Sequence, residues 1–472
     1  MPKVLVLGSG LVGSVLAADL AATRGFRVTV VDRDEAPLAN ARRRAAIAGG
    51  RVSTQVADCG KPSVVRRLAK DADLVVGALP SRFGFDALRA VLEAKRPYCD
   101  ISFMNDDPEE LDALAKRQGV AAVVDCGVAP GLSHMLAAAG VRRLDRADRI
   151  DIMVGGLPRR RAWPYEYKAG FSPFDVIEEY VRPARLVEGG RVVVKEALSE
   201  PELVEFPGVG TLEAFNTDGL RSLVTSSSVP DMRERTLRYP GHIELMRVLR
   251  ETGLFGLDPV SIRDGATVRP RDLLAELLFP KWTYEEGEED LTAMRVSVEG
   301  ELDGRPTRLE WDLLDFHDPR TGFSSMARTT AFPAAAVARM IAAGLLATPG
   351  VHVPERLAEM DGVVESVLHQ LAERGVVPAF RAMTSKAASK SPGRRSATRS
   401  GAASGKAGGN ATTPASKRAA EKTGVAKAKR AVAKTPANKA GAKKATKAGA
   451  TKAVAKKPVA KKAAKAATRS RR

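Results

Sequence analysis

The sequence predicts an α/β protein in which an N-terminal doubly wound parallel sheet is followed by an α+β domain and a disordered C-terminal tail. Over the first 130 residues, short β-branched runs alternate with stretches of helical periodicity, a pattern typical of βαβ units. Further strand-like runs then follow at irregular spacing, which indicates a mixed or antiparallel sheet. Beyond Met383 the chain consists mostly of Ala, Lys, Gly, Thr, Ser and Pro, which offer too little bulky apolar surface to form a core.

The first domain is expected at residues 1–130. Strands are predicted at 4–7, 28–31, 52–56, 74–76 and 121–124, and helices at 12–23, 35–48 and 85–94. Because helices separate these strands, the strands should pair in parallel.

The second domain is expected at residues 131–335. Its predicted strands are 149–155, 191–194, 211–215, 294–300 and 307–313, and its predicted helices are 173–180, 241–251 and 271–278. Two Ala/Leu-rich helices follow at 331–347 and 355–374, and we expect residues 336–382 to pack back on the first domain. Residues 383–472 form the predicted tail.

The positive charge of the chain is concentrated in the tail. The whole chain carries a formal charge of +19, but residues 381–472 hold 27 Lys and Arg against the single acid Glu421, a net +26. The other 380 residues hold 48 basic and 55 acidic side chains, a net −7. This split excludes a basic nucleic-acid-binding body.

Several other classes of protein are also excluded. The three cysteines, Cys59, Cys99 and Cys126, have no CxxC spacing, which predicts neither a disulfide framework nor a zinc site. The N-terminus lacks the long apolar core of a signal peptide, and no run approaches 18 apolar residues. We therefore expect a cytoplasmic protein with no metal and no membrane contact, to which the tail adds a potential association with the nucleoid.

A glycine motif directly follows the first predicted strand. It is a GxGxxG formed by Gly8, Ser9, Gly10, Leu11, Val12 and Gly13. In a βαβ unit the first glycine permits the tight turn, the second lets the backbone approach a pyrophosphate, and the third allows close helix–strand packing. The pyrophosphate sits at the helix N-terminus, where free N–H groups favour negative charge. The motif therefore predicts a Rossmann domain that binds a nicotinamide dinucleotide.

The ends of the next strands supply further candidate contacts. Asp32 ends the second strand and can accept hydrogen bonds from a ribose, which favours NAD, while Arg33 beside it leaves NADP open. Asp58 and Cys59 follow the third strand, where Asp58 could meet the adenine. The fourth strand ends at Ala78, Leu79 and Pro80, which we place beside the nicotinamide.

Several polar clusters lie beyond the first domain, and together they carry a family resemblance. In chain order they are DCGVAPG (125–131), GGLP (155–158), YEYK (165–168), LEAFNTDG (212–219) and LRYPGH (237–242). With the GxGxxG, this order resembles the saccharopine dehydrogenase family over residues 1–350. The family includes glutamate-forming saccharopine dehydrogenases and lysine 6-dehydrogenases.

The resemblance implies oxidation of the C–N bond at the ε-carbon of lysine or of an N-substituted lysine. Hydride would pass to NAD(P), and water would hydrolyse the imine to an aminoadipate semialdehyde-type product. Such chemistry needs proton-transfer groups and anchors for carboxylates. Candidates for proton transfer are Lys168 and His242. Candidates for substrate binding are Asp100, Ser102, Tyr167, Asn216, Thr217, Arg221, Arg238 and Tyr239, of which the two arginines would clamp carboxylates.

Each of these residues also has a structural alternative. His242 could have only a local role in its helix, Lys168 could lie on the surface, and Arg238 could pair with Glu234 or Glu244. Cys126 is better interpreted as a small core residue than as a nucleophile. His134, at the start of a helix, could cap that helix or line the cleft.

The substrate stays open between saccharopine and L-lysine. The family also implies a homodimer. A different class of function remains as an alternative: a nucleotide-binding redox sensor or scaffold that is tethered to nucleic acid and has no turnover.

The tail resembles the C-terminal domain of linker histones and the lysine-rich tails of some bacterial histone-like proteins. Its charge predicts salt-sensitive binding to the phosphates of DNA or RNA without sequence preference. With no aromatic residue after Phe380, it cannot stack on bases. The alternative is a solubilising appendage.

Overall fold

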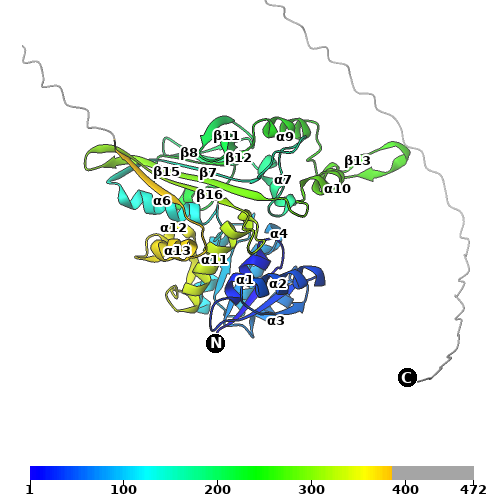
Figure 1. Ribbon diagram of the computed structural model, residues 1–472, viewed down its shortest axis with the longest axis vertical. Coiled ribbons are helices and arrows are strands. Elements are labelled where there is room, and N and C mark those ends of the chain that lie inside the picture. Colours follow the sequence, from blue (N-terminus) through cyan, green and yellow to red (C-terminus); the bar gives the residue numbers. More distant parts are fainter. Residues whose placement is uncertain (385–472) are drawn as a thin grey trace, which may run out of the picture. The chain divides into compact units, whose positions relative to one another are not determined.

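Two β-sheets with their flanking helices make up residues 1–384, the part of the chain that the computed structural model describes (Figure 1). The first sheet has seven parallel strands in the order β17-β6-β5-β4-β1-β2-β3. The strands are β1 Lys3–Leu7, β2 Arg27–Asp32, β3 Val52–Val56, β4 Leu74–Gly77, β5 Tyr98–Asp100, β6 Ala121–Val123 and β17 Gly350–His352. The helices between them are α1 Gly13–Ala21, α2 Glu35–Ile47, α3 Pro62–Ala69, α4 Ser81–Glu93, η1 Pro108–Leu111 and α5 Asp112–Gln118.

Local sequence explains these elements. The strands β1, β2 and β4 are rich in Val and Leu, and most of their side chains are buried, as expected of strands covered on both faces. Helix α3 has Pro62 at its start, where the missing N–H has no cost. Helix α5 stops at Gly119, whose φ of 69° is readily adopted only by glycine.

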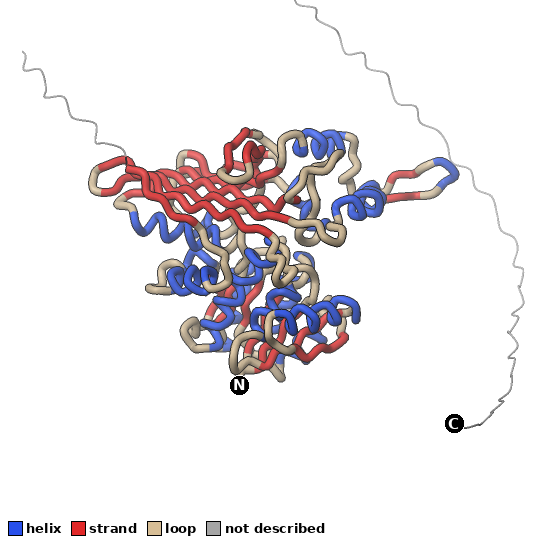
Figure 2. The backbone as a smooth tube through the Cα atoms, in the orientation of Figure 1, coloured by secondary structure: helices blue, strands red, loops and turns tan. Residues whose placement is uncertain are grey.

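The second sheet has nine strands, and β12 pairs in parallel with β7 while the other neighbours are antiparallel. Figure 2 shows its long strands as a layer apart from the first sheet. The strands are β7 Arg146–Pro158, β8 Ala184–Glu188, β9 Arg191–Lys195, β10 Glu202–Phe206, β11 Gly210–Asn216, β12 Asp231–Arg238, β15 Asp290–Leu302, β16 Arg305–Phe316 and β18 Ala379–Thr384. A small hairpin of β13 Val260–Ser261 and β14 Thr267–Val268 stands apart from both sheets.

Helices cover one face of the second sheet and connect it to the first. The remaining helices are α6 Leu132–Arg143, α7 Pro173–Val181, α8 Leu223–Ser226, α9 His242–Glu251, η2 Arg263–Gly265, α10 Pro270–Trp282, α11 Ser325–Ala342, α12 Pro354–Leu357 and α13 Val363–Ala372. Val298 and Trp311 point toward α6, where a Cβ on Gly140 would lie 2.6 Å from Val298. A glycine therefore permits this close helix–sheet contact.

Helix α11 packs on α1 and also contacts β4, β5 and β15, so it touches strands of both sheets. Its Arg339 pairs with Asp19 of α1, and Arg374, which follows α13, pairs with the same carboxylate at 2.5 Å. The Asp19 side chain is only 10% exposed. One buried carboxylate thus ties the C-terminal helices to the first domain.

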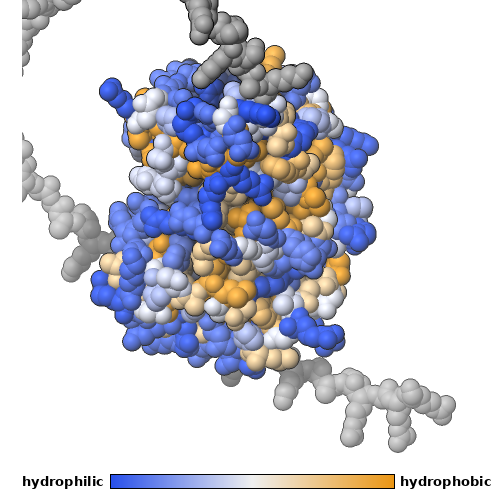
Figure 3. Space-filling view, turned by 90° about the vertical axis from the view of Figure 1, so that its left-hand side faces the viewer, coloured by the Kyte–Doolittle hydropathy of each residue, from blue (hydrophilic) through white to orange (hydrophobic). Residues whose placement is uncertain are grey.

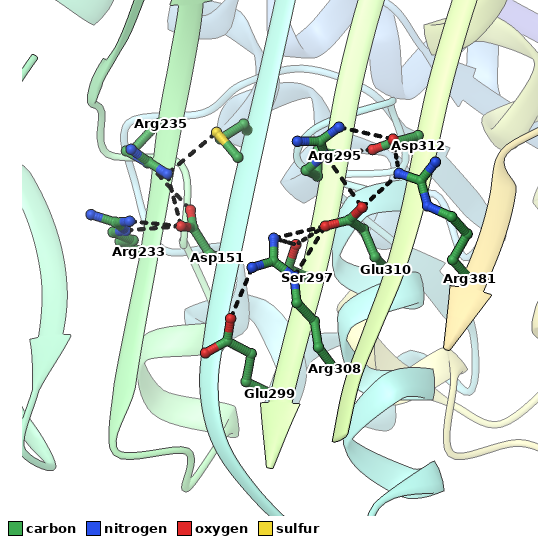
Figure 4. Close-up of polar contacts among 11 residues, drawn as sticks. Asp151, Arg233, Arg235, Arg295, Ser297, Glu299, Arg308, Glu310, Asp312 and Arg381 are labelled. Carbon is green, nitrogen blue, oxygen red and sulfur yellow. Dashed lines mark hydrogen bonds and ion pairs between the residues drawn. The ribbon is translucent and has the colours of Figure 1, made fainter. Parts of the chain in front are cut away.

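The opposite face of the second sheet carries a ladder of ion pairs (Figure 4). Asp151 lies 2.8 Å from Arg233 and 2.7 Å from Arg235. Glu310 lies 2.7 Å from Arg308 and 2.6 Å from Arg381 of the edge strand β18. These pairs explain how a strand face with so many charges stays only partly exposed.

The predicted fold class is confirmed, and several element boundaries differ. The helix predicted at 355–374 is two helices, α12 and α13, because Gly362 adopts a left-handed φ of 75° between them. The helix predicted at 331–347 begins at Ser325 and ends at Ala342. The strands β5, β8, β10, β12, β13, β14, β17 and β18 were not predicted.

The predicted start of the tail also differs. Residues 383 and 384 belong to β18, which pairs with β16 from Thr307 to Asp312. The rest of the predicted disordered tail lies outside the described residues.

On the face seen in Figure 3, hydrophilic side chains predominate and hydrophobic ones gather near the middle. Within residues 1–384, no helix combines the length and hydropathy that a membrane crossing requires.

Candidate active site

A cavity of about 590 Å³ opens where strand ends of the first sheet meet residues of the second domain. The carboxyl end of β2 contributes to its lining, together with the segments that follow β1, β3, β4 and β5. Ligands of open α/β sheets bind at this end, where the strand order reverses, and here that point lies between β1 and β4.

The glycine turn between β1 and α1 forms one wall of the cavity. Gly8 has a φ of 94°, and an added Cβ there would collide with the carbonyl of Ala78. A Cβ on Gly13 would collide with the carbonyl of Gly8. Around Gly10, in contrast, no protein atom lies within 4 Å of the Cβ position. The turn therefore has the close packing and the open approach that a dinucleotide pyrophosphate needs.

Asp32 and its neighbours form the adenosine end. The Asp32 carboxylate accepts hydrogen bonds from the backbone N–H groups of Ser9, at 2.8 Å, and Asp34, at 3.2 Å. Arg33 lies beside it on the cavity, with its side chain 71% exposed. Burial, with the nearby Asp32 and Asp58 carboxylates, raises the pKa of Cys59 to about 12, so this residue stays a thiol.

Nearly all predicted cofactor contacts line the cavity. They are Gly8, Gly10, Leu11, Val12, Gly13, Asp32, Arg33, Asp58, Cys59, Ala78, Leu79 and Pro80. Ser9 is absent from the lining and instead fixes Asp32 through its N–H. The residues present thus fit a nicotinamide dinucleotide.

Strand β12 and helix α7 form the opposite side of the cavity, which we call the polar wall. Its members are Asp175, Glu178, Glu179, Arg182, Glu234, Thr236 and Arg238. The last three alternate along β12, and side chains two residues apart in a strand point to the same face. Thr217, Asp218 and Gly219 lie next to them.

The structure places both predicted proton-transfer residues behind the cavity lining. Lys168 forms an ion pair with Glu288 and donates to the carbonyl of Thr283 at 3.2 Å. His242 is 1% exposed, with its ring nitrogens bonded to the Tyr180 hydroxyl and the Tyr165 carbonyl. Burial and the charge of Arg238 lower its pKa to about 3, so the ring is neutral.

The two predicted carboxylate clamps are already occupied by protein groups. Arg221 binds Asp125 at 3.1 Å and the Met104 carbonyl at 2.7 Å, outside the cavity lining. Arg238 lies on the polar wall, but it binds Glu179 at 2.7 Å and stacks over the ring of Tyr167. Its partner is therefore neither Glu234 nor Glu244.

The remaining predicted substrate residues divide between the cavity and its supporting layer. Ser102 and Thr217 line the cavity. Asp100, Tyr167, Asn216 and Tyr239 do not line it: Asp100 accepts from Ser102, Tyr167 lies under Arg238, Asn216 donates to Ser199 and Glu200, and Tyr239 donates to the Pro158 carbonyl. Of these four residues, Asp100 and Tyr167 contact residues that line the cavity, namely Ser102 and Arg238.

Most of the charges on the polar wall are paired. Glu178 binds Arg271 at 2.7 Å, Glu179 binds Arg238, and Asp175 accepts from the Ser81 hydroxyl. Arg182 donates only to the neutral Asn105 side chain and stacks over Phe103. Within residues 1–384 it is the one arginine of this wall without an acidic partner.

Sequence reasoning missed the acidic members of the wall and Arg182. The signal that could have found Glu234 is the alternation of Glu, Thr and Arg at 234, 236 and 238, had this segment been interpreted as a strand. No comparable signal marks Glu178 and Glu179 of α7 or Arg182, which directly follows that helix, because the orientation of the helix depends on tertiary packing. Groups of His, Cys, Asp and Glu able to hold a metal are absent from the described part of the chain, and its three cysteines are buried and free.

Comparison with known proteins agrees with this geometry. Residues 4–123 match the family described as "Saccharopine dehydrogenase NADP binding domain", and residues 127–376 match "Saccharopine dehydrogenase C-terminal domain". Saccharopine dehydrogenase [NADP(+), L-glutamate-forming] of Schizosaccharomyces pombe is 22% identical, over 80% of this chain and 98% of its own. Carboxynorspermidine synthase of Vibrio cholerae is 26% identical, over 60% of this chain and 73% of its own.

A solved structure supports the fold. Apo saccharopine dehydrogenase (L-Glu forming) from Saccharomyces cerevisiae superposes with a TM-score of 0.66 at 19% identity, covering 81% of this chain and all of the other. The two matched family regions meet where the glycine turn faces the polar wall. The chain therefore belongs to the saccharopine dehydrogenase family and is an oxidoreductase with a nicotinamide cofactor.

Proposed function

We propose that this oxidoreductase acts on the C–N bond of an amino acid that carries one carboxylate and a remote amino group, as L-lysine does. The observation that carries the proposal is the state of the arginines on the polar wall. Arg238 is bound to Glu179, so Arg182 is the arginine of this wall that is available for a substrate carboxylate. Saccharopine, with three carboxylates, would need more such anchors than this wall offers.

The residues on the cavity have separable roles in this proposal. Arg182 binds the carboxylate, and the packing of Phe103 against its guanidinium fixes the position of that charge. The turn from Gly8 to Gly13 binds the pyrophosphate. The bound nicotinamide supplies the acceptor or donor of a hydride at the substrate carbon.

For the cofactor we propose NADP, although Asp32 by itself predicts NAD. Both Asp32 oxygens are engaged by backbone N–H groups, and Arg33, next to Asp32 in the chain, also lines the cavity. A guanidinium group there suits a 2′-phosphate. The names of the fungal relatives specify NADP for those proteins.

The test is NADPH and NADH formation by the full chain, with L-lysine and with saccharopine as separate substrates. The expected result is NADPH from L-lysine at a rate well above that from saccharopine. Turnover of saccharopine alone would overturn the proposed substrate class, and a preference for NAD would overturn the proposed cofactor. Arg182→Lys is expected to raise KM for L-lysine about ten-fold, since it loses the bidentate contact, without changing KM for the nucleotide.

A further inference from the structure

A buried cluster of three charged side chains lies directly behind the polar wall. His134, near the start of α6, has its Nε2 3.5 Å from Glu234 and its Nδ1 3.6 Å from Glu355 of α12. The three residues are 0%, 3% and 5% exposed. Of the three, only Glu234 lines the cavity.

The cluster contains more negative than positive charge. Burial opposes protonation of His134, but the adjacent Glu234 and Glu355 carboxylates outweigh it and raise the pKa of His134 to about 10. One imidazolium therefore faces two carboxylates. Glu355 receives a second partner, the Ser226 hydroxyl at 2.6 Å, whereas Glu234 receives none.

Glu234 is thus an acceptor with unused capacity on the wall of the cavity. Across residues 1–384, no group has the geometry of a hydrogen bond to its carboxylate: the fully buried Oε2 faces His134 Nε2 at 3.5 Å, but that nitrogen bonds to the Gly219 carbonyl at 3.1 Å. Gly219 leaves the room that this carboxylate occupies, because a Cβ there would collide with its Oε1. A ligand in the cavity that brings N–H donors would give this carboxylate the hydrogen bonds that it lacks within the described residues.

We propose that Glu234 receives the amino nitrogen of the substrate, and that His134 and Glu355 are positioning residues that hold its carboxylate toward the cavity. The proposal rests on the proposed function only in that the ligand carries an amine. A charged amino group supplies both the missing donors and the missing positive charge. Arg182 and Glu234 would then bind the two ends of an amino acid with a remote amino group.

The test compares two ligands that differ only in the amino group. Binding of L-lysine and of L-norleucine to the full chain in the presence of NADP is measured by calorimetry, for wild type and for Glu234→Gln. We expect wild type to prefer L-lysine by about 10- to 100-fold, the range for a hydrogen bond to a charged group, and Glu234→Gln to bind both ligands alike. Wild type that binds the two alike, or a variant that keeps the preference, would overturn the proposal.

Further variants separate this role from effects on folding. Glu310→Gln removes a buried glutamate of the same sheet that belongs to the ion-pair ladder and not to the cavity lining, and should leave the preference intact. Glu234→Asp keeps the charge and should keep part of the preference. His134→Gln should reduce the preference less than Glu234→Gln, with NADPH affinity unchanged in both; an unaltered preference in His134→Gln would remove its positioning role.

The outcome is distinguishable from failure of the proposed function. Lysine preference that depends on Glu234, in a protein that forms no NADPH from lysine, would support the binding site and overturn the activity. NADPH formation from L-lysine, by a protein whose preference for L-lysine over L-norleucine is unchanged in Glu234→Gln, would support the activity and overturn the binding site.

Discussion

At the scale of single residues, the glycine turn requires glycine for two different physical reasons. Gly13 is needed because its Cβ position lies against the carbonyl of Gly8, whereas the Cβ position of Gly10 faces open space. Substitution should therefore affect stability at one position and ligand binding at the other.

We predict that Gly13→Ala lowers both the stability of the fold and the affinity for NADPH, because the α1–β1 packing must open. Gly10→Ala should change the free energy of unfolding by less than about 0.5 kcal/mol and weaken NADPH binding at least ten-fold, since the methyl group enters the space of the pyrophosphate. Chemical denaturation and nucleotide fluorescence titration measure the two effects. A Gly10→Ala protein that binds NADPH normally would place the pyrophosphate elsewhere.

Asp100 predicts a pH dependence of stability. Burial raises its pKa from 3.8 to about 7, with the nearby Asp125 carboxylate as a further cause and hydrogen bonds from Ser102 in opposition. Between pH 4 and 7 the folded chain then binds more protons than the unfolded chain, so this group destabilises the fold as pH rises. Asp100→Asn should gain stability relative to wild type, by up to about 4 kcal/mol between pH 4 and 8. Urea unfolding of both proteins across this pH range tests the prediction. If the free energy of unfolding changed with pH in the same way in wild type and in Asp100→Asn, the prediction would be contradicted.

How much of the site the sequence predicts depends on the kind of residue. The cofactor contacts are predicted well, because Gly8 to Gly13 and Asp32 occupy fixed offsets after strands and a local motif determines their position. Lys168, His242 and Arg221 carry suitable functional groups, but their partners Glu288, Tyr180 and Asp125 lie 62 to 120 residues away in sequence. Whether such a side chain faces a ligand or another protein group is decided by tertiary pairing, which the motif does not encode.

At the scale of elements, the first sheet is the more predictable one. Strands β1, β2 and β4 are rich in Val and Leu, are largely buried on both faces and alternate with helices, so composition marks them, whereas the three-residue strands β5 and β17 were not predicted. Strand β12 escaped prediction because its DMRERTLR sequence carries charges on both faces. Those charges are stabilised by Asp151 and Glu179, contributed by β7 and α7.

The attachment of α11 and α13 to α1 should depend on Asp19. Asp19→Ala leaves Arg339 and Arg374 without their shared, buried partner, and we expect a loss of about 3 kcal/mol in the free energy of unfolding. Asp86→Ala is the matched control, because Asp86 forms an exposed pair with Arg89 of the same helix, whose loss should cost less than about 1 kcal/mol. Equal effects of the two substitutions would mean that the Asp19 pairs contribute little.

At the scale of the whole molecule, the charge of the chain is divided between a slightly acidic body and a basic C-terminal segment. Only the body falls within the described residues, so the segment's role follows from its sequence. With a net +26 over residues 381–472, it is predicted to bind polyanions by counterion release.

We therefore expect the full chain to bind duplex DNA with an affinity that falls steeply as salt increases, and a chain ending at Thr384 to lose most of this binding. Electrophoretic mobility shifts at several salt concentrations measure it. The turnover of the shortened chain, assayed in parallel without DNA, should match that of the full chain. Equal DNA binding by the two chains would show that the C-terminal segment is not responsible for the binding.

The edge strand β17 has a consequence for how the protein is made. It pairs with β6 to complete the first sheet, yet it lies at residues 350–352, after the entire second sheet apart from β18. A ribosome therefore releases six strands of the dinucleotide-binding sheet long before the seventh exists. During that interval the edge of β6 stays open to other chains, so a nascent chain is expected to depend most on chaperones after its first domain has emerged and before residue 352 has followed.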